Sequence, residues 1–182
     1  NLIGTAKAMC TAVLVTDSVT FIASRTYNSP TNAIRRLNAD GTSTAITIPA
    51  SLSGGAGEIT SMVQNNGQLW VFSASVSTAI YYMAITATTL VAITGGSGYL
   101  TNAVVFNGSI YGTSASYGNR ILYRYTGTTT TRSFVQVGNT GQSDADYTSK
   151  LFVYNNRIIL TRSEGMFGYD GIRLVPIELA ID

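Results

Sequence analysis

Apolar and polar residues follow one another along this chain in short segments, and the same order of segments occurs four times. Each copy has two apolar strands joined by a tight turn, then an aromatic or basic strand, then a β-branched strand. The turns lie 49 residues apart between Asp17 and Asn66 and 41 residues apart between Asn66 and Asn107. This spacing is typical of four-stranded propeller blades, which repeat every roughly 40 to 50 residues.

The first two strands of each copy are predicted to form a hairpin around a two-residue turn. Asn, Asp and Gly adopt a positive φ at the least cost, and a type I′ turn needs a positive φ at both central positions. Apolar side chains alternate or run without interruption beside the turns, as in strands that are buried on both faces. The hairpins span 11–24, 61–75, 102–116 and 150–163, with Asp17-Ser18, Asn66-Gly67, Asn107-Gly108 and Asn155-Asn156 at their turns.

The third and fourth strands complete each copy. Because side chains alternate between the faces of a strand, Tyr123 and Tyr125 are expected on one face and Arg124 on the other. We therefore expect the two tyrosines to be buried between blades and Arg124 to reach the rim or an ion-pair partner. The third strands are predicted within 33–41, 79–86, 120–127 and 165–171, and the fourth within 44–48, 89–93, 133–137 and 173–177.

Together these elements predict an all-β fold, a β-propeller made of four repeats of a four-stranded antiparallel sheet. The blades are expected at roughly 8–50, 58–96, 101–138 and 147–181, either as a single domain of residues 1–182 or as part of a larger ring. No apolar period of 3.6 residues lasts longer than one turn, so almost no helix is expected. A β-sandwich or barrel and a β-helical fibre are the alternatives. No strand is left over to close the ring by exchange, so closure must come from the termini or from partner segments.

The charge content narrows the classes of partner. Only 11% of the residues are charged and the net charge is +2, so Thr, Ser, Asn, Gly and Tyr must form most of the polar surface. Nucleic-acid binding needs a concentrated basic field, and only Arg35 and Arg36 are adjacent, so no nucleic-acid partner is expected. No apolar run reaches the roughly 18 residues of a membrane span and no signal peptide is recognisable, so no membrane insertion is expected. The start at Asn1 suggests a processed product or a piece of a longer polypeptide.

Residues for most catalytic and metal sites are missing from the sequence. Without histidine, a Ser-His-Asp triad, a Cys-His dyad and His-ligated zinc are excluded. The single cysteine, Cys10, cannot form a cysteine cluster and is expected to be a small buried side chain. We therefore expect no cofactor, no metal and no catalytic residue. Two carboxylates would suffice for glycoside hydrolysis, but Asp17, Asp40 and Asp170 lie in predicted turns, where such side chains bond to their own backbone.

Aromatic side chains remain as candidates for recognition. A large ring with a polar tip stacks on a sugar or on a flat protein patch, and exposed Tyr and Trp mark such surfaces. Packing between blades is the commoner use, and we expect it for Trp70. The adjacent Tyr81 and Tyr82 must divide between the faces of their strand, one ring inward and one outward. The candidate binding residues are Trp70, Tyr82, Tyr111, Arg124 and Tyr169.

Two third strands carry motifs that resemble those of degenerate propeller repeats. These are LYRYTG at 122–127 and MFGYDG at 166–171, and each follows an Asn-turn hairpin. There is no Trp-Asp dipeptide of the WD type, and the pairs Gly54-Gly55 and Gly95-Gly96 are not placed as in kelch repeats. The composition, rich in Thr, Ser, Gly and Tyr, is similar to that of bacteriophage virion and tail proteins, some of which carry propellers.

This resemblance implies a non-enzymatic structural or host-attachment module of a larger assembly such as a phage tail, in a virion or outside the cell. Its expected partners are other protein subunits of the assembly and cell-surface glycans. The alternative is a lectin-like propeller with a glycan pocket in each blade or blade interface. A glycosidase-type enzyme is the third and weakest reading, because it would need a carboxylate pair brought together across blades.

Overall fold

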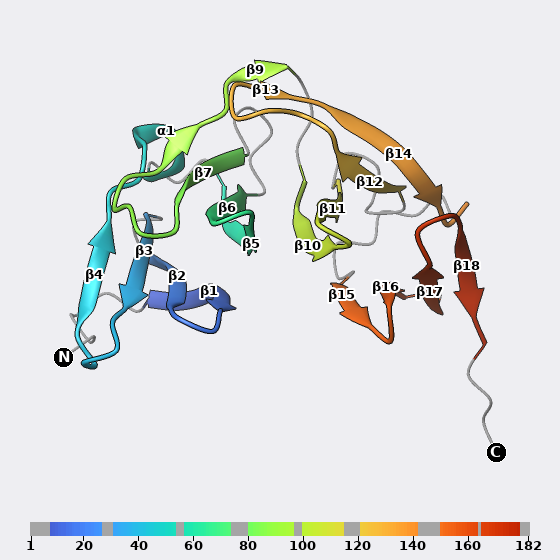
Figure 1. Cartoon of the computed structure of the whole chain (residues 1–182), viewed down its shortest axis with the longest axis horizontal. Coiled ribbons are helices and arrows are strands. Elements are labelled where there is room, and N and C mark those ends of the chain that lie inside the picture. Colours follow the sequence, from blue (N-terminus) through green and yellow to red (C-terminus); the bar gives the residue numbers. More distant parts are fainter. Residues whose placement is uncertain are drawn as a thin grey trace.

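The computed structural model of the chain describes residues 8–26, 31–53, 57–73, 80–96, 100–114, 121–141, 150–163 and 165–178. These residues form four antiparallel sheets of four strands each, arranged as the blades of a propeller (Figure 1). The all-β propeller with four-stranded repeats is therefore confirmed. Within each blade, consecutive strands pair side by side, so each blade is a local meander of the chain.

The strands of the four blades have the following bounds. Blade 1 contains β1 (Ala8–Val15), β2 (Thr20–Thr26), β3 (Asn32–Leu37) and β4 (Ser43–Ile46). Blade 2 contains β5 (Ile59–Asn65), β6 (Gln68–Ser73), β7 (Ile80–Ala84) and β8 (Val91–Ala92). Blade 3 contains β10 (Asn102–Phe106), β11 (Ser109–Thr113), β12 (Ile121–Tyr125) and β14 (Phe134–Asn139). Blade 4 contains β15 (Lys150–Tyr154), β16 (Arg157–Arg162), β17 (Gly165–Tyr169) and β18 (Leu174–Ile177).

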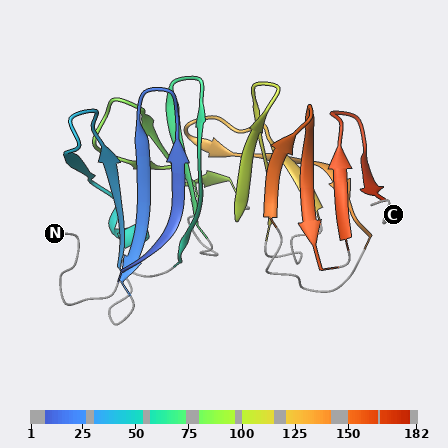
Figure 2. The same ribbon diagram turned by 90° about the horizontal axis from the view of Figure 1, so that it is seen from below.

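The blades follow one another around an arch, and blades 1 and 4 stand apart at its two ends (Figure 1). The first strand of each blade lies on the inner side of the arch, where β1 contacts β5, β5 contacts β10, and β10 contacts β15. Seen from the open side, blade 1 and blade 4 stand in front, with blades 2 and 3 behind them (Figure 2). Three junctions between blades therefore form within the chain, and the arch stays open.

The hairpin turns follow the predicted chemistry in three blades. The pairs Asn66-Gly67, Asn107-Gly108 and Asn155-Asn156 have φ values between 46° and 71°, as a type I′ turn requires. In blade 1 the hairpin forms, but neither Asp17 nor Ser18 has a positive φ. Thr16 shapes that turn instead, because its Oγ1 accepts from the N–H of Val19 at 3.0 Å and donates to the Val19 carbonyl at 2.9 Å. The prediction that Asp17-Ser18 forms the same type I′ turn as the other three pairs was therefore wrong.

Helix is limited to one turn among the described residues, α1 (Ala50–Ser53), between blades 1 and 2. Pro49 precedes it and its carbonyl accepts from the N–H groups of Leu52 and Ser53, both at 2.9 Å. The side chain of Leu52 is buried, and the Asn32 amide donates to the Leu52 carbonyl at 2.7 Å. Helix α1 therefore packs at one end of the junction between blades 1 and 2, where Leu52 is buried and Asn32 holds its carbonyl.

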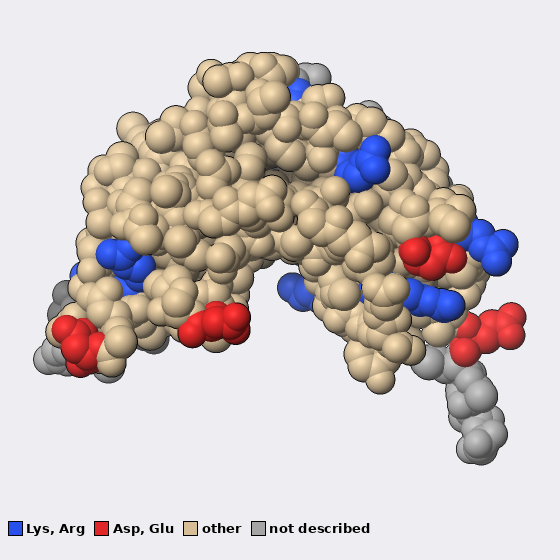
Figure 3. All heavy atoms as spheres, in the orientation of Figure 1, with Lys and Arg blue, Asp and Glu red and all other residues tan. Residues whose placement is uncertain are grey.

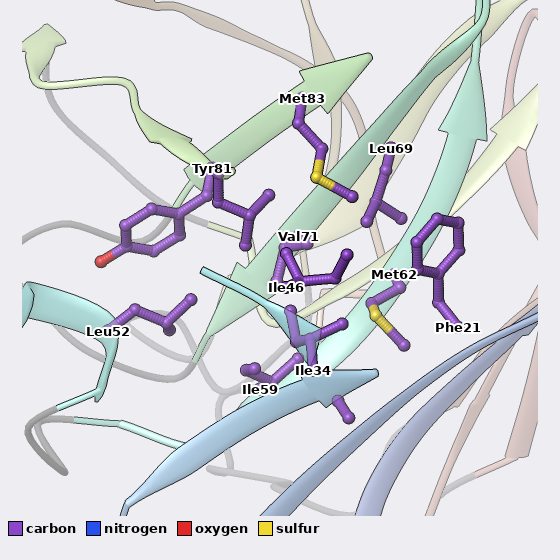
Figure 4. Close-up of a cluster of buried hydrophobic side chains, with 12 residues drawn as sticks. Phe21, Ile34, Ile46, Leu52, Ile59, Met62, Leu69, Val71, Tyr81 and Met83 are labelled. Atoms are coloured by element: carbon purple, nitrogen blue, oxygen red, sulfur yellow. The ribbon is translucent and has the colours of Figure 1, made fainter. Parts of the chain in front are cut away.

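The core between blades 1 and 2 is mainly aliphatic (Figure 4). Phe21 and Ile34 of blade 1 meet Leu69, Val71 and Tyr81 of blade 2, and each of these side chains is at most 1% exposed. Fully burying a side chain of this size contributes about 1.5–3 kcal/mol. This junction therefore ties the first two blades together by apolar contact.

The same positions of each blade face the same neighbour. The third residue before the hairpin turn, Leu14, Val63 or Val104, packs against the following blade. So does the third residue after the turn, which is Phe21, Trp70 or Tyr111. We call this side of a blade its forward face. The rear face, which packs on the preceding blade, carries the fourth residue before the turn, namely Met62, Ala103 or Leu151.

Two junctions are also bridged at the outer rim by parallel pairing. After β4, Thr47 pairs with Thr89, and the Thr47 N–H donates to the Thr88 carbonyl at 2.8 Å. After β8, strand β9 (Gly95–Gly96) pairs with β13 (Thr131–Arg132). Each bridge joins the segment after one blade to the segment before the last strand of the next. Among the described residues no such pairing joins blades 3 and 4.

Cys10 is exposed, so the expectation of a buried cysteine was wrong. It pairs with Ser24 in the β1–β2 register, and the register shifts between Cys10 and Ala12. The irregularity puts Cys10 on the rear face of blade 1, together with Val13. No described blade covers this face, so the Cys10 side chain stays exposed.

Candidate functional site

An open groove of about 660 Å³ runs along the inner side of the arch. It is lined by the first strands of all four blades, mostly by apolar side chains, with Thr16, Asp17 and Gln64 as its polar side chains. The space-filling view shows the arch hollowed on this side, with most charged side chains on its two limbs and few on its crown (Figure 3). Asp17 is the only carboxylate among the described residues of the lining, so these residues provide no pair of carboxyl groups for acid–base catalysis.

Two other carboxylates are committed to turns, as the sequence predicts. Asp40 Oδ1 accepts from the hydroxyl of Thr42 at 2.7 Å and from its N–H at 2.9 Å, and these bonds lower the pKa of the Asp40 carboxyl. Asp170 Oδ1 accepts from the N–H groups of Arg173 and Ile172, and these two bonds lower the pKa of Asp170. A carboxyl with a lowered pKa stays ionised near neutral pH and is a poor general acid.

An aromatic cluster fills the junction between blades 2 and 3. Trp70, 7% exposed, lies 5.7 Å from Tyr82 and 5.4 Å from Tyr125 between ring centroids. Phe134 stands 5.5 Å from Tyr125 and 6.3 Å from Tyr123 in edge-on contacts, so the cluster spans β6, β7, β12 and β14. Such pairs stabilise beyond the area that they bury. Trp70 is a core residue, as expected.

The Tyr125 hydroxyl and the Trp70 indole N–H of this cluster differ in their hydrogen bonding. The Tyr125 hydroxyl donates to the Thr128 carbonyl at 2.6 Å. Burial raises the pKa of Tyr125 to about 12, against a smaller opposite effect of the Arg132 guanidinium. The buried Nε1 of Trp70 has no hydrogen-bond partner among the described residues. Inside the junction the Tyr125 hydroxyl is therefore hydrogen-bonded, whereas the Trp70 indole N–H has no partner among the described residues.

A second aromatic pair lies between blades 3 and 4. Tyr111 and Tyr169 are 6% and 4% exposed, and their ring centroids are 5.7 Å apart. Burial is the main cause that raises the pKa of Tyr169, and the nearby Arg124 guanidinium opposes it. Arg124 itself is exposed, as the sequence predicts. It stands at the rim of this junction.

The structure therefore divides the five candidate binding residues between two junctions. Trp70 and Tyr82 lie in one, and Tyr111, Arg124 and Tyr169 lie in the next. Tyr81 is fully buried toward blade 1, whereas Tyr82 is half-buried toward blade 3. The pair does divide between two faces, but the outward face meets another blade rather than solvent. Only Arg124 of the five is exposed.

Sequence reasoning missed Arg36, which occupies on blade 1 the position of Arg124 on blade 3. Its Nη1 donates to the carbonyls of Ile85, Thr86 and Ala87 of blade 2, at 3.3, 3.1 and 3.4 Å. A rim pocket of about 400 Å³ opens beside it. Alternation along β3, counted from the Ile34 core position, could have shown that Arg36 points toward blade 2.

Within the described ranges, no group of three or more Cys, Asp or Glu side chains could hold a metal ion. No described helix is long and apolar enough to cross a membrane.

No protein-family model and no curated protein sequence matches the chain. Solved structures do match it. A virginiamycin B lyase from Staphylococcus aureus superposes with a TM-score of 0.66 and 12% identity over 96% of this chain and 59% of its own. A Bacteroides thetaiotaomicron protein of unknown function gives a TM-score of 0.63 and 10% identity, over 92% of this chain and 42% of its own.

A third match is the xyloglucan PUL GH43B protein of Bacteroides ovatus, with a TM-score of 0.59 and 9% identity over 97% of this chain and 42% of its own. At such identities the likeness concerns the propeller fold alone. The chain spans between 42% and 59% of the length of these three structures.

Proposed function

We propose that this chain is a non-enzymatic structural or host-attachment module of a larger assembly, such as a phage tail or another virion component. The observation that carries the proposal is the apolar surface at both ends of the arch. Val13 and Val15 of blade 1 are 53% and 71% exposed, and Phe152 and Tyr154 of blade 4 are 43% and 70% exposed. Grouped apolar side chains of this kind mark sites of protein contact.

The chemistry of the remaining surface supports the same proposal. Only 11% of the residues are charged, so contacts on the crown and rim rely on shape and on hydroxyl and amide groups. The groove contains a single carboxylate, and Asp40 and Asp170 are held by their own turns. The partners in this proposal are other protein subunits of a virion or extracellular particle.

Gene order and particle composition test the virion part. Genes for portal, capsid and tail proteins are expected beside the gene for this chain, and antibodies against the chain should label one part of the particle in electron micrographs. Neighbouring genes of ordinary metabolism, or unlabelled particles, would contradict it. A panel of chromogenic glycosides should remain uncleaved; hydrolysis that is lost in Asp17→Asn would favour the enzyme instead.

A lectin-like role is the second candidate, and the inner groove favours it. Gln64 supplies a neutral polar group among mostly apolar lining side chains, which is a chemistry suited to sugars. The Bacteroides ovatus structure that resembles the chain carries xyloglucan in its name.

A glycan array tests this second candidate. Binding that is lost in Gln64→Ala but kept in Gln136→Ala, an exposed glutamine of β14, would support the lectin. An array without any bound glycan would reject it.

A further inference from the structure

We propose that two copies of this chain join end to end, so that blade 4 of each copy packs on blade 1 of the other and the two arches close an eight-bladed ring. The proposal rests on the structural role proposed above and names the partner as a second copy. Propellers close with typically four to eight blades, and two arches of four blades fall within that range.

The forward face of blade 4 repeats the positions that form the three existing junctions. Phe152 and Ile159 stand three residues before and three residues after the turn, where blades 1 to 3 carry their contacts with the following blade. Met166 and Ile177 pair with each other on β17 and β18 and extend this apolar face outward. Phe152 is nevertheless 43% exposed and Ile159 is 6% exposed, and no described blade covers this face.

The rear face of blade 1 is the complementary surface. Val13 stands four residues before the turn, where the other blades carry a residue that packs on the preceding blade. Val15 and Leu37 continue this face and are 71% and 38% exposed. Cys10 lies on the same face and is exposed as well. The two uncovered faces of one chain are thus the two halves of one more junction.

The existing junctions predict which residues meet across the copies. Trp70 contacts Tyr125 at 5.4 Å, and Tyr111 contacts Tyr169 at 5.7 Å, between a forward-face and a rear-face position. By strand register, Ile159 holds the forward-face position in blade 4 and Leu37 holds the rear-face position in blade 1. The new junction therefore brings the face of blade 4 around Ile159, whose own side chain is 6% exposed, onto Leu37 of the other copy.

The hairpin turns give the contact an electrostatic match. In the chain, Asn65 beside one turn donates to the Gly108 carbonyl in the turn of the next blade, at 3.3 Å. In blade 4 the corresponding place is held by Tyr154 and its register partner Arg157. The turn that follows in the closed ring is Asp17-Ser18, which contains the only carboxylate among the four hairpin turns. Arg157 of one copy therefore faces Asp17 of the other.

Closure explains why two copies suffice. A head-to-tail contact produces a ring if its rotation closes and an open filament if it does not. When the first contact forms, the second becomes intramolecular and is favoured by the high effective concentration of the free ends. The dimer therefore contains two identical new junctions and leaves no apolar end face in solvent.

Light scattering after gel filtration tests the proposal. At about 50 µM the mass should be twice the 19.3 kDa of one chain. Val13→Asp should weaken dimerisation at least about tenfold, since it buries a charge in the contact. Val135→Asp, at a valine of β14 that is similarly exposed, is the matched control and should leave the dimer intact. Circular dichroism verifies that both variants fold.

Two further experiments test the contact between the copies: exchange of the Asp17 and Arg157 charges, and the reactivity of the Cys10 thiol. Asp17→Arg and Arg157→Asp should each weaken the dimer, and the double variant should recover it. The Cys10 thiol should react with Ellman's reagent several-fold more slowly in the dimer than in Val13→Asp, because the junction covers it.

A monomer at 50 µM, or a ladder of trimers and longer species, would overturn the two-copy ring. Either result leaves the virion role untouched, since gene order and particle labelling decide that role separately.

Discussion

The junction between blades 2 and 3 and the junction between blades 3 and 4 use the same positions of the same repeat, yet they are not equally strong. Among the described residues, the first buries a cluster of seven apolar side chains and is tied at its rim by β9 and β13. The second buries five and has no rim pairing among the described residues. The repeat therefore fixes which faces meet, while the segments between blades decide how firmly they are held.

This difference predicts a gradient of stability along the chain. In a repeat protein, each unit is stabilised mainly by its neighbours, so a terminal unit with one weak interface opens first. In the described part of the chain blade 4 has that position, because its strands contact those of blade 3 and no parallel strand pair joins the two at the rim. The following variants test the gradient, beginning with the largest expected effect.

Shortening the side chain at the third position after the hairpin turn should lower the free energy of unfolding most in the centre of the arch. Trp70→Ala should lower the free energy of unfolding by about 3–5 kcal/mol, since it removes the ring that joins Tyr82 and Tyr125. Ile159→Ala, at the matching position of blade 4, should cost about 2 kcal/mol, because it removes a smaller buried side chain that packs against no described neighbouring blade of its own chain. Urea denaturation measures both. Equal losses would contradict the gradient.

The rim bridge should come next. A methyl group at Gly96 would collide with the carbonyl oxygen of Arg132, and the residue has a φ of +75°. Gly96→Ala should therefore cost about 3 kcal/mol and loosen blade 3 from blade 2. Gly141→Ala is the control, because Gly141 has a φ of +79° with open space around it and should cost about 1 kcal/mol. If the two variants melt alike, the bridge does not stabilise the junction.

The hairpin turn of blade 1 differs in conformation from the hairpin turns of blades 2 and 3. Gly67→Val and Gly108→Val force a β-branched residue into positive φ at positions with open space around them, so strain alone should cost about 1–3 kcal/mol. Ser18→Val in blade 1 should change stability by less than about 0.5 kcal/mol, since Ser18 has no positive φ. Thermal scans compare the three. A large loss in Ser18→Val would contradict the different turn in blade 1.

The smallest effect concerns alkaline pH. The pKa of Tyr125 is raised in the folded state from 10.0 to about 12, so the folded protein binds the phenolic proton more tightly than the unfolded chain does. This contribution is complete below pH 10 and is lost as the pH rises from about 10 to 12. Tyr125→Phe should lose part of the decline in stability over that interval, measured by urea titrations at several pH values. An unchanged decline would mean that Tyr125 ionises freely in the fold.

Local chemistry made much of this architecture predictable from the sequence. Asn-Gly pairs have few alternatives to a type I′ turn, and alternation along β12 correctly divides Tyr123 and Tyr125 from Leu122, which packs toward blade 4. Trp70 was expected in the core for similar reasons. Each of these inferences depends on residues a few positions apart.

The features that the sequence did not predict depend on contacts between residues far apart in the chain, or on a side chain that competes for the same hydrogen bonds. Cys10 was expected to be buried because apolar strands are usually covered, but coverage depends on a neighbouring blade. The pair Gly95-Gly96 pairs with Thr131–Arg132, and nothing local indicates that distant partner. At Asp17-Ser18, the hydroxyl of Thr16 satisfies the turn in a different way. The inner groove arises only when four first strands converge, so no single segment predicts it.

The two parallel rim pairs also determine how the arch responds to mechanical load. When a force pulls its ends apart, the Thr47–Thr89 bridge and the β9–β13 pair oppose separation of the outer edges of the first two junctions. Among the described residues the third junction has side-chain packing and the Arg162–Thr140 hydrogen bond but no parallel strand pair, so blade 4 should detach at the lowest force, before the other blades. In an optical trap, the first extension step should therefore come from blade 4. Unfolding of this blade would absorb mechanical work while the other three blades stay folded.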